Sequence, residues 1–337
     1  MRDRKAADAP IRGKTTTMLT LSLPVLSSEA LAPLTERLAA MTAPCPMHPS
    51  VHRIEAAVIT WSRELGLEAV PGADAHRLAG RALAGCDAPS ATLFARWLVW
   101  AGRFREEPAA RAGVLAVAGG GDPGPHVVER AFADLWRVSA PGMSEGWRER
   151  FRSGLAAQHT ALPAPRDAVP PAPRDAVPPA PRRPAPPVLP DAALSGAGRD
   201  RTGFGTYLLD LVEPCLGVEV PVSVAGSPQW RAVTEASGDV AAWCDLLAAG
   251  RVPAAAGERT PDGVVERIVT RMEELWTAAR AVPALVERRG LDFAASAEVT
   301  RVTCAFLTVS RAYLERLLEA GTRYAAQTRE SPTGVRL

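Results

Sequence analysis

Lysine is nearly missing from this 337-residue chain, and asparagine is missing altogether. The two lysines, Lys5 and Lys14, both lie near the N-terminus. A P-loop needs a lysine at the phosphates, a pyridoxal enzyme needs a Schiff-base lysine, and a protein kinase needs a lysine together with a metal-binding asparagine. The composition excludes these three classes and leaves arginine as the cation that can grip carboxylates or phosphates.

Long apolar runs and a strong excess of one charge are lacking as well. No apolar stretch reaches the roughly 18 to 20 residues that cross a bilayer, and the formal net charge is only +2. A basic start followed by the apolar residues 18–26 loosely resembles an export signal, but Asp3, Asp8 and Pro24 argue against one. We therefore expect neither a nucleic acid nor a membrane as a partner.

Cysteine and histidine are few, and their spacing is not that of a zinc site. The cysteines are odd in number, widely spaced and set in apolar surroundings, which indicates buried thiols in a reducing cytoplasm. They are Cys45, Cys86, Cys215, Cys244 and Cys304. The sequence predicts a cytoplasmic protein without zinc.

Proline is concentrated in one segment. The octad PAPRDAVP begins at Pro163, repeats from Pro171 and returns in a decayed form from Pro179, so that 12 of the 31 prolines lie between residues 161 and 190. Because proline lacks a backbone N–H and disfavours helix at the residue before it, we expect a disordered or extended spacer. It is either a tolerated repeat expansion, which we favour, or a Pro-Arg ligand for a protein partner.

Apolar residues recur at three- and four-residue steps on both sides of this spacer, a period typical of α-helices. Examples are Val51, Ile54, Val58, Trp61 and Leu65; Leu93, Trp97, Trp100 and Phe104; Phe204, Tyr207, Leu208, Leu211 and Val212; and Val302, Ala305, Phe306, Val309 and Tyr313. Ser50 and Thr260-Pro261-Asp262 precede two such stretches, as helix starts do. The sequence predicts an all-α bundle of roughly ten or more helices.

Neither helical half looks self-contained, because both carry wide apolar faces that need partners. We therefore expect one α-helical domain over residues 20–330, interrupted by the Pro-rich spacer at 161–190. Residues 1–19 and 331–337 are expected to be tails.

Several segments occur in an order and at spacings that match a known family. They are LSLPVL, then MHPSVHRIEAAVITWSRELGL from Met47, DPGPHVVERAFADLWRVSAPGMSEGWRERF from Asp122, GRDRTGFGTYLLDLVE from Gly198, and Arg323-Tyr324 in AGTRYA. Together they resemble the bacterial class I terpene synthases: the opening proline segment and first helix, the helices before the mid-chain loop, the diphosphate-sensing segment and the terminal arginine-tyrosine pair. The resemblance covers residues 20 to 326 without the spacer.

This resemblance implies an α-helical bundle that ionises a prenyl diphosphate, farnesyl or similar, and guides the carbocation to a cyclic product. In that family Mg²⁺ ions and arginines neutralise the departing diphosphate, and apolar walls keep water from the cation. Tryptophans on the helical stripes either line such a pocket or, more commonly, pack in the core. The candidates are Trp61, Trp97, Trp100, Trp136 and Trp276.

The first metal motif departs from the family pattern. When Trp97 and Trp100 are aligned with the aromatic run before the aspartate-rich motif, Arg105, Glu106 and Glu107 fall where that motif begins. An arginine thus replaces the leading aspartate, and a guanidinium cannot ligate magnesium. Glu106 and Glu107 are the remaining metal-ligand candidates here, unless they form a solvated pair at a helix end.

The second metal motif keeps a single carboxylate, that of Asp245. Cys244, Ala248 and Val252 stand where the family has asparagine, serine and glutamate. A magnesium ion bound here would keep most of its waters and bind weakly.

The anion-binding positions are kept instead. Arg199 matches the sensor arginine in its separation from Asp245, with Thr202 and Gly203 at the linker and effector positions. Arg323 also has the expected separation. The resemblance therefore implies two sets of site residues: catalytic Arg199, Thr202 and Gly203, and diphosphate-binding Arg199, Arg323 and Tyr324.

Two functions remain open on the sequence. The first is a terpene cyclase with a reduced metal site, in which Arg105, Arg199 and Arg323 replace part of the magnesium charge. The second is a catalytically impaired relative that binds a prenyl ligand, or that contacts a protein through its Pro-Arg spacer.

Overall fold

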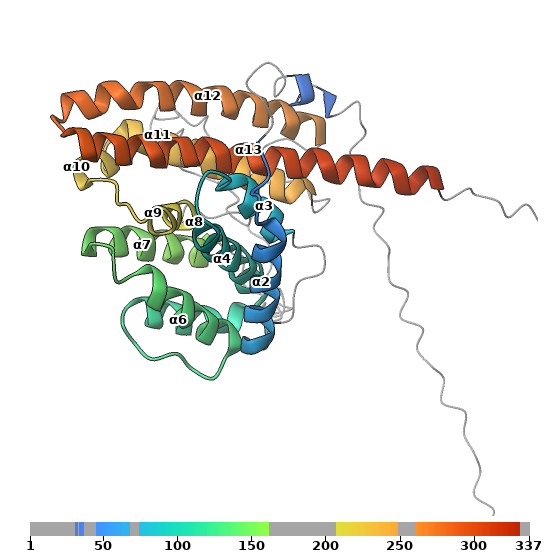
Figure 1. Cartoon of the computed structure of the whole chain (residues 1–337), viewed down its shortest axis with the longest axis horizontal. Helices are drawn as coiled ribbons and strands as arrows, with labels where there is room; N and C mark the ends of the chain where they lie inside the picture. Colours follow the sequence, from blue (N-terminus) through green and yellow to red (C-terminus); the bar gives the residue numbers. More distant parts are fainter. Residues whose placement is uncertain are drawn as a thin grey trace, which may run out of the picture.

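The computed structural model describes residues 31–32, 34–36, 45–67, 74–161, 207–248 and 261–330, with the side chains of residues 158–161, 261–262 and 322–330 excepted. Every regular element within these ranges is a helix, which confirms the predicted all-α bundle (Figure 1). The Pro-rich spacer lies outside the described residues apart from residue 161.

Twelve α-helices and one 3₁₀ turn are described, in agreement with the expected number. They are α2 (Val51–Leu65), α3 (Ala75–Ala82), α4 (Ala88–Glu106), η1 (Pro108–Ala110), α5 (Arg111–Ala118), α6 (Val127–Ser139), α7 (Glu145–Ala161), α8 (Tyr207–Asp210), α9 (Val212–Leu216), α10 (Val222–Ala225), α11 (Pro228–Ala248), α12 (Pro261–Arg288) and α13 (Phe293–Glu330).

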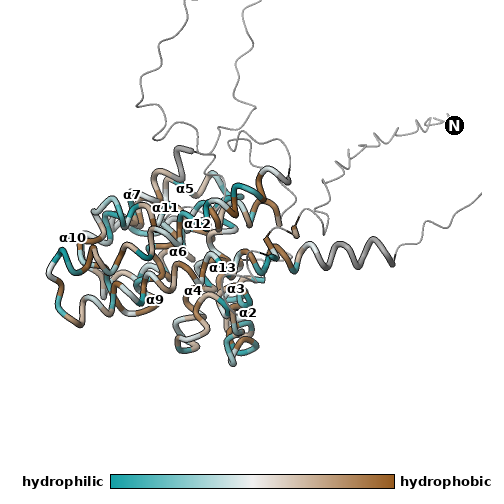
Figure 2. Tube along the Cα trace, turned by 90° about the horizontal axis from the view of Figure 1, so that it is seen from above, coloured by the Kyte–Doolittle hydropathy of each residue, from teal (hydrophilic) through white to brown (hydrophobic). Residues whose placement is uncertain are grey.

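The three longest helices, α11, α12 and α13, lie side by side, and the shorter helices pack against one side of this layer (Figure 1). Apolar and polar stretches alternate along the helices, as amphipathic helices require (Figure 2). None of the helices in the described ranges combines the length and apolar character needed to cross a membrane.

Helices on both sides of the spacer contribute to one hydrophobic core. Trp100 of α4 and Trp147 of α7 are fully buried, as are Val240 of α11 and Phe306 of α13, and all four belong to a single contact cluster. The segments before and after the spacer therefore bury their apolar faces against each other. The domain limits at residues 20 and 330 stay a prediction.

Two predicted helix starts are confirmed, although one is capped differently from expectation. α12 begins at Pro261, where a missing N–H costs nothing because the first N–H groups of a helix have no intrahelical partner. α2 follows Ser50, but the Ser50 side chain forms no cap. Instead the Ser50 N–H donates to Nδ1 of His48 at 3.0 Å.

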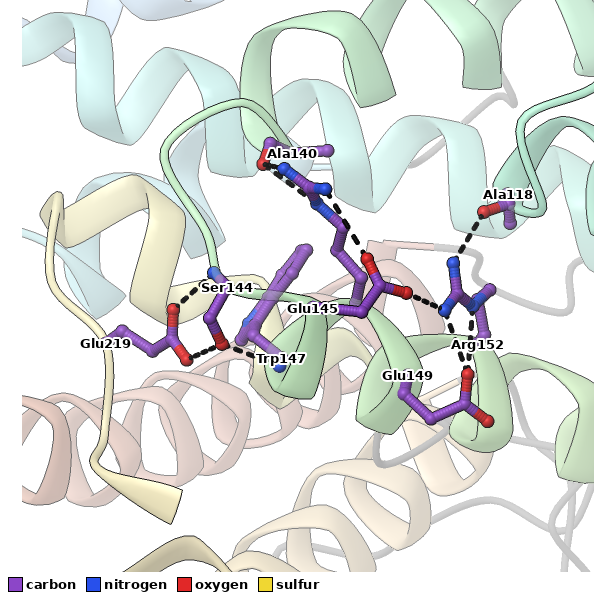
Figure 3. Close-up of polar contacts among 9 residues, drawn as sticks. Ala118, Ala140, Ser144, Glu145, Trp147, Glu149, Arg152 and Glu219 are labelled. Carbon is purple, nitrogen blue, oxygen red and sulfur yellow. Dashed lines mark hydrogen bonds and ion pairs between the residues drawn. The ribbon is translucent and has the colours of Figure 1, made fainter.

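Polar contacts fix α7, which carries several residues of the site described below (Figure 3). The Ser144 hydroxyl accepts a hydrogen bond from the Trp147 N–H at 3.2 Å and caps the helix. Glu219, from the loop after α9, accepts a hydrogen bond from the Ser144 N–H at 2.7 Å. Further along α7, Arg152 donates to the Ala118 carbonyl at the end of α5. These contacts hold α7 against α5 and against the loop after α9.

All five cysteines are free thiols. Cys215 and Cys244 are buried, and burial raises the pKa of both thiols. Cys45 and Cys86 are only partly buried and Cys304 is exposed, so the prediction of five buried thiols is confirmed for two of them and wrong for Cys304. The core-facing stripe of α13 runs through Val302 and Phe306, and position 304 lies on the other side of the helix.

Candidate functional site

Residues of the two predicted metal motifs meet at one ion cluster. Arg105 lies in the last turn of α4, and its Nη1 is 2.7 Å from Oδ2 of Asp245 in the last turn of α11. Nη1 of Arg316, on α13, is 2.8 Å from the other carboxylate oxygen of Asp245. We call Arg105, Asp245 and Arg316 the ion triad. It joins three helices whose residues are distant in the sequence.

All three members of the ion triad are charged. The Asp245 side chain is 17% exposed, and that burial alone would raise its pKa. The attraction of Arg105 and Arg316 outweighs burial and holds the pKa of Asp245 below its usual value. Burial opposes the charge of Arg105, but Asp245 outweighs it and raises the pKa of Arg105. The triad therefore carries a net positive charge of one.

Each arginine uses only one terminal nitrogen for the bond to Asp245. A guanidinium has five N–H donors, and the remaining donors of Arg105 and Arg316 make no hydrogen bond to the described part of the chain. The ion triad thus has both the charge and the spare donors to hold a further anion.

Two buried tyrosines interact electrostatically with the ion triad. Tyr207 of α8 and Tyr313 of α13 are 1% and 4% exposed, and burial raises the pKa of both phenols although the nearby charge of Arg105 opposes this. The Tyr207 ring packs edge-on against Trp100 and Phe151, with ring centroids 6.4 Å and 5.8 Å away. Tyr207 therefore links the ion triad to the aromatic interior.

That interior is a continuous group of aromatic rings from α4, α6 and α7. We call it the aromatic cluster: Trp97, Trp100, Phe104, Phe132, Trp136, Trp147 and Phe151. Trp100 stacks on Phe104 with centroids 4.7 Å apart, and Trp136 stacks on Phe151 at 5.1 Å. The indole N–H of Trp100 donates to the Val128 carbonyl at 3.0 Å, so this polar group is satisfied inside the core.

A second ion cluster holds α8 and α9 against α7. Nε of Arg150 is 2.9 Å from Oδ1 of Asp210, and its Nη2 is 2.6 Å from Oε1 of Glu213. The other Glu213 oxygen accepts the Val220 N–H at 2.9 Å. Burial raises the pKa of Asp210 to about 6 and that of Glu213 to about 7, despite the opposing effect of Arg150. This cluster fixes the short helix that begins at Tyr207.

Solved structures share this arrangement of helices. Linalool/nerolidol synthase from Streptomyces clavuligerus, in complex with 2-fluorogeranyl diphosphate, has a TM-score of 0.62 and 18% identity, over 81% of this chain and 96% of that one. Germacradien-4-ol synthase from Streptomyces citricolor has a TM-score of 0.61 and 18% identity, over 83% and 97%. Wild-type cucumene synthase has a TM-score of 0.55 and 23% identity, over 82% and 97%. The chain has the class I terpene synthase fold.

No protein-family model and no curated protein sequence matches the chain. The class I terpene synthase fold is therefore identified from the arrangement of the helices, and it agrees with the fold that the sequence resemblance implies. At these identities the likeness concerns the fold alone.

Within this class I terpene synthase fold, the candidate metal ligands are paired with cationic side chains. The Glu106 side chain is 53% exposed and lies 3.1 Å from Arg103. Glu107 contacts Arg103 at 3.5 Å and His126 at 3.7 Å. Both carboxylate oxygens of Asp245 accept hydrogen bonds, one from Arg105 and one from Arg316. Among the described residues, no group of three or more histidine, cysteine, aspartate or glutamate side chains could hold a metal ion.

The described residues therefore do not fit a magnesium ion at this place. Magnesium takes oxygen ligands in a nearly octahedral set, and here it would have to displace two guanidinium groups from one carboxylate. Arg105 and Arg316 already balance the charge of this carboxylate.

The side chains of the other predicted site residues lie outside the part of the chain that the structure describes. Arg199, Thr202 and Gly203 lie outside the described residues, and Arg323 and Tyr324 belong to α13 with their side chains outside it. Position 323 is seven residues after Arg316, so the two positions share one face of α13, about 10 Å apart along its axis. Roles for these five residues stay predictions.

The sequence does not identify three residues of the site: Arg316, Tyr207 and Tyr313. Its pattern places Tyr207 and Tyr313 only on apolar helical stripes. The seven-residue spacing of Arg316 and Arg323 was the one available signal, because residues at this spacing share a helix face. The partner of Arg316 is 71 residues away, so the sequence does not disclose the pair.

Proposed function

We propose that this protein binds a prenyl diphosphate and holds the diphosphate with arginine side chains in place of magnesium. The observation that carries the proposal is the ion triad: Arg105 and Arg316 converge on Asp245 from two helices, at the end of α11. The fold supports the ligand class, because linalool/nerolidol synthase has been solved with 2-fluorogeranyl diphosphate bound.

The diphosphate end of the ligand fits the charge and donors of the ion triad. Two guanidiniums present planar sets of N–H groups, which suit the bidentate recognition of phosphate oxygens. Water screens their excess positive charge only in part, because most of each side chain is buried: Arg105 is 32% and Arg316 24% exposed. We assign Arg199, Arg323 and Tyr324 to the same anion as further proposed contacts.

We place the apolar prenyl end of the ligand on the side of Tyr207 that meets the aromatic cluster. Tyr207 contacts both Trp100 and Phe151, so the polar and aromatic parts of the site are directly continuous. Aromatic faces also stabilise a developing cation. The same arrangement would serve ionisation and cyclisation, with the arginines taking up the charge of the departing diphosphate.

The experiment measures binding and turnover with and without magnesium. Purified protein is titrated calorimetrically with the diphosphates of geraniol, farnesol and geranylgeraniol, in EDTA and in magnesium, and the extracts are analysed by gas chromatography. We expect one of these ligands to bind equally well in EDTA. A cyclic product formed in EDTA would identify a metal-independent cyclase, and binding without product a ligand-binding protein.

Variants test the role of the arginines. Arg316→Gln should weaken binding at least tenfold because it removes one charged donor. Arg271→Gln is the matched control: Arg271 of α12 also pairs with an aspartate of α11, Asp239, at 2.7 Å, and its loss should leave binding unchanged. Binding or product that requires magnesium and disappears in Asp245→Ala would refute the proposal and establish an ordinary metal-dependent cyclase.

A further inference from the structure

Asp245 occupies its two arginines in the way that a ligand phosphate would. One guanidinium binds each carboxylate oxygen, at 2.7 and 2.8 Å. Two oxygens of a phosphate can be held by two guanidiniums in the same manner. The chain thus carries an anion of its own at the position where the arginines would grip an external anion.

The position of Asp245 is unfavourable for a carboxylate in every respect other than its pairing with arginine. It lies in the last turn of α11, at the negative end of the helix dipole. It is largely buried, and the adjacent Cys244 is a buried thiol whose pKa is raised by burial. A neutral side chain would fit such a place better. The contribution of Asp245 to the site is therefore its charge.

We propose that Asp245 is an internal competitor of the diphosphate: it pairs with Arg105 and Arg316 in the free protein, cancels one of their two positive charges and lowers the affinity of the site for anions. The proposal rests on the arginine grip proposed above and adds a regulatory contact to it. Asp245 would weaken binding by either of two routes. In the first, the ligand has to displace the carboxylate from the arginines. In the second, the ligand binds their spare N–H groups a few ångströms from the negative charge of Asp245, and this repulsion costs binding free energy.

The test uses inorganic pyrophosphate, which lacks a prenyl chain, with the full-length protein in EDTA. The variant Asp245→Asn keeps the shape of the side chain and removes its charge. We expect it to bind pyrophosphate at least tenfold more tightly than the wild type does. The double variant Asp245→Asn/Arg316→Gln should lose this gain, because one of the two released guanidiniums is gone.

The matched control is Asp239→Asn. Asp239 lies on the same helix, pairs with Arg271 at 2.7 Å and has a similar side-chain exposure, 24%, so this variant makes the same change of net charge away from the site. It should bind pyrophosphate as the wild type does. An equal gain in both variants would show a general effect of charge and would overturn the proposal.

Two further outcomes would also overturn it. One is unchanged or weaker binding by folded Asp245→Asn. The other is loss of the folded state, monitored by circular dichroism, in both Asp245→Asn and Asp245→Ser, which would show that Asp245 is a structural support. Failure of the proposed function is distinguishable: a pyrophosphate gain in Asp245→Asn without preference for farnesyl diphosphate over pyrophosphate would support the competitor and refute the prenyl ligand.

Discussion

Arg105 and Asp245 are 140 residues apart in the sequence, yet a guanidinium nitrogen of Arg105 lies 2.7 Å from a carboxylate oxygen of Asp245. They are the residues that the sequence resemblance places at two separate metal motifs. The arginine cannot ligate a metal ion, and it supplies the charge that the aspartate would otherwise take from one. Two residues that the resemblance aligns with different motifs thus form one ionic contact.

Loss of Arg105 should destabilise the fold, because Asp245 would keep only one cationic partner in a largely buried place. We expect Arg105→Met to lower the free energy of unfolding by about 1–3 kcal/mol, less than for a fully buried pair because the site is partly exposed. Urea denaturation measures the change.

A double-mutant cycle isolates the contact. In the background of Asp245→Asn, Arg105→Met should cost at least about 1 kcal/mol less than in the wild type. Strictly additive changes would show that Arg105 stabilises the fold by other means.

The cluster of Arg150, Asp210 and Glu213 should make stability fall as the pH rises from about 4 to about 7. The pKa values of Asp210 and Glu213 are raised in the folded state to about 6 and about 7. In this window the folded protein therefore binds more protons than the unfolded chain, and the stabilisation present at low pH is lost as the pH rises.

The variant Asp210→Asn checks this dependence. An amide cannot titrate, so the free energy of unfolding should fall less between pH 4.5 and pH 7.5 than in the wild type. Unfolding curves at several pH values provide the measurement, and parallel profiles for the two proteins would contradict the assignment.

A larger residue at Gly154 should destabilise the fold, because α7 and α8 approach closely there. A Cβ at position 154 would lie 3.1 Å from Cβ of Tyr207 and 3.4 Å from its backbone. We expect Gly154→Ala to lower stability by about 1–2 kcal/mol despite the better helix propensity of alanine, and to weaken ligand binding by shifting Tyr207.

Gly102, inside α4, is the matched control. A Cβ there meets no atom within 4 Å, so Gly102→Ala should raise stability by up to about 1 kcal/mol. Thermal denaturation of both variants compares the two effects. A stabilising Gly154→Ala would show that α7 and α8 can separate without cost.

Several features of the fold were predictable because they depend on neighbours in the sequence. The spacing of Val51, Ile54 and Val58 predicts α2, and Pro261 predicts the start of α12. The number and apolar neighbours of the cysteines do not predict the exposure of Cys304, although position 304 lies off the apolar stripe through Val302 and Phe306.

The sequence by itself determined the helical class and which residues stand at the predicted metal positions, because helix period and residue identity are local properties. Only the tertiary structure decided that Arg105 and Arg316 meet at Asp245, across separations of 140 and 71 residues. Such a contact depends on how α4, α11 and α13 pack in one core. Packing is set by many distant apolar contacts together, and no local pattern encodes it.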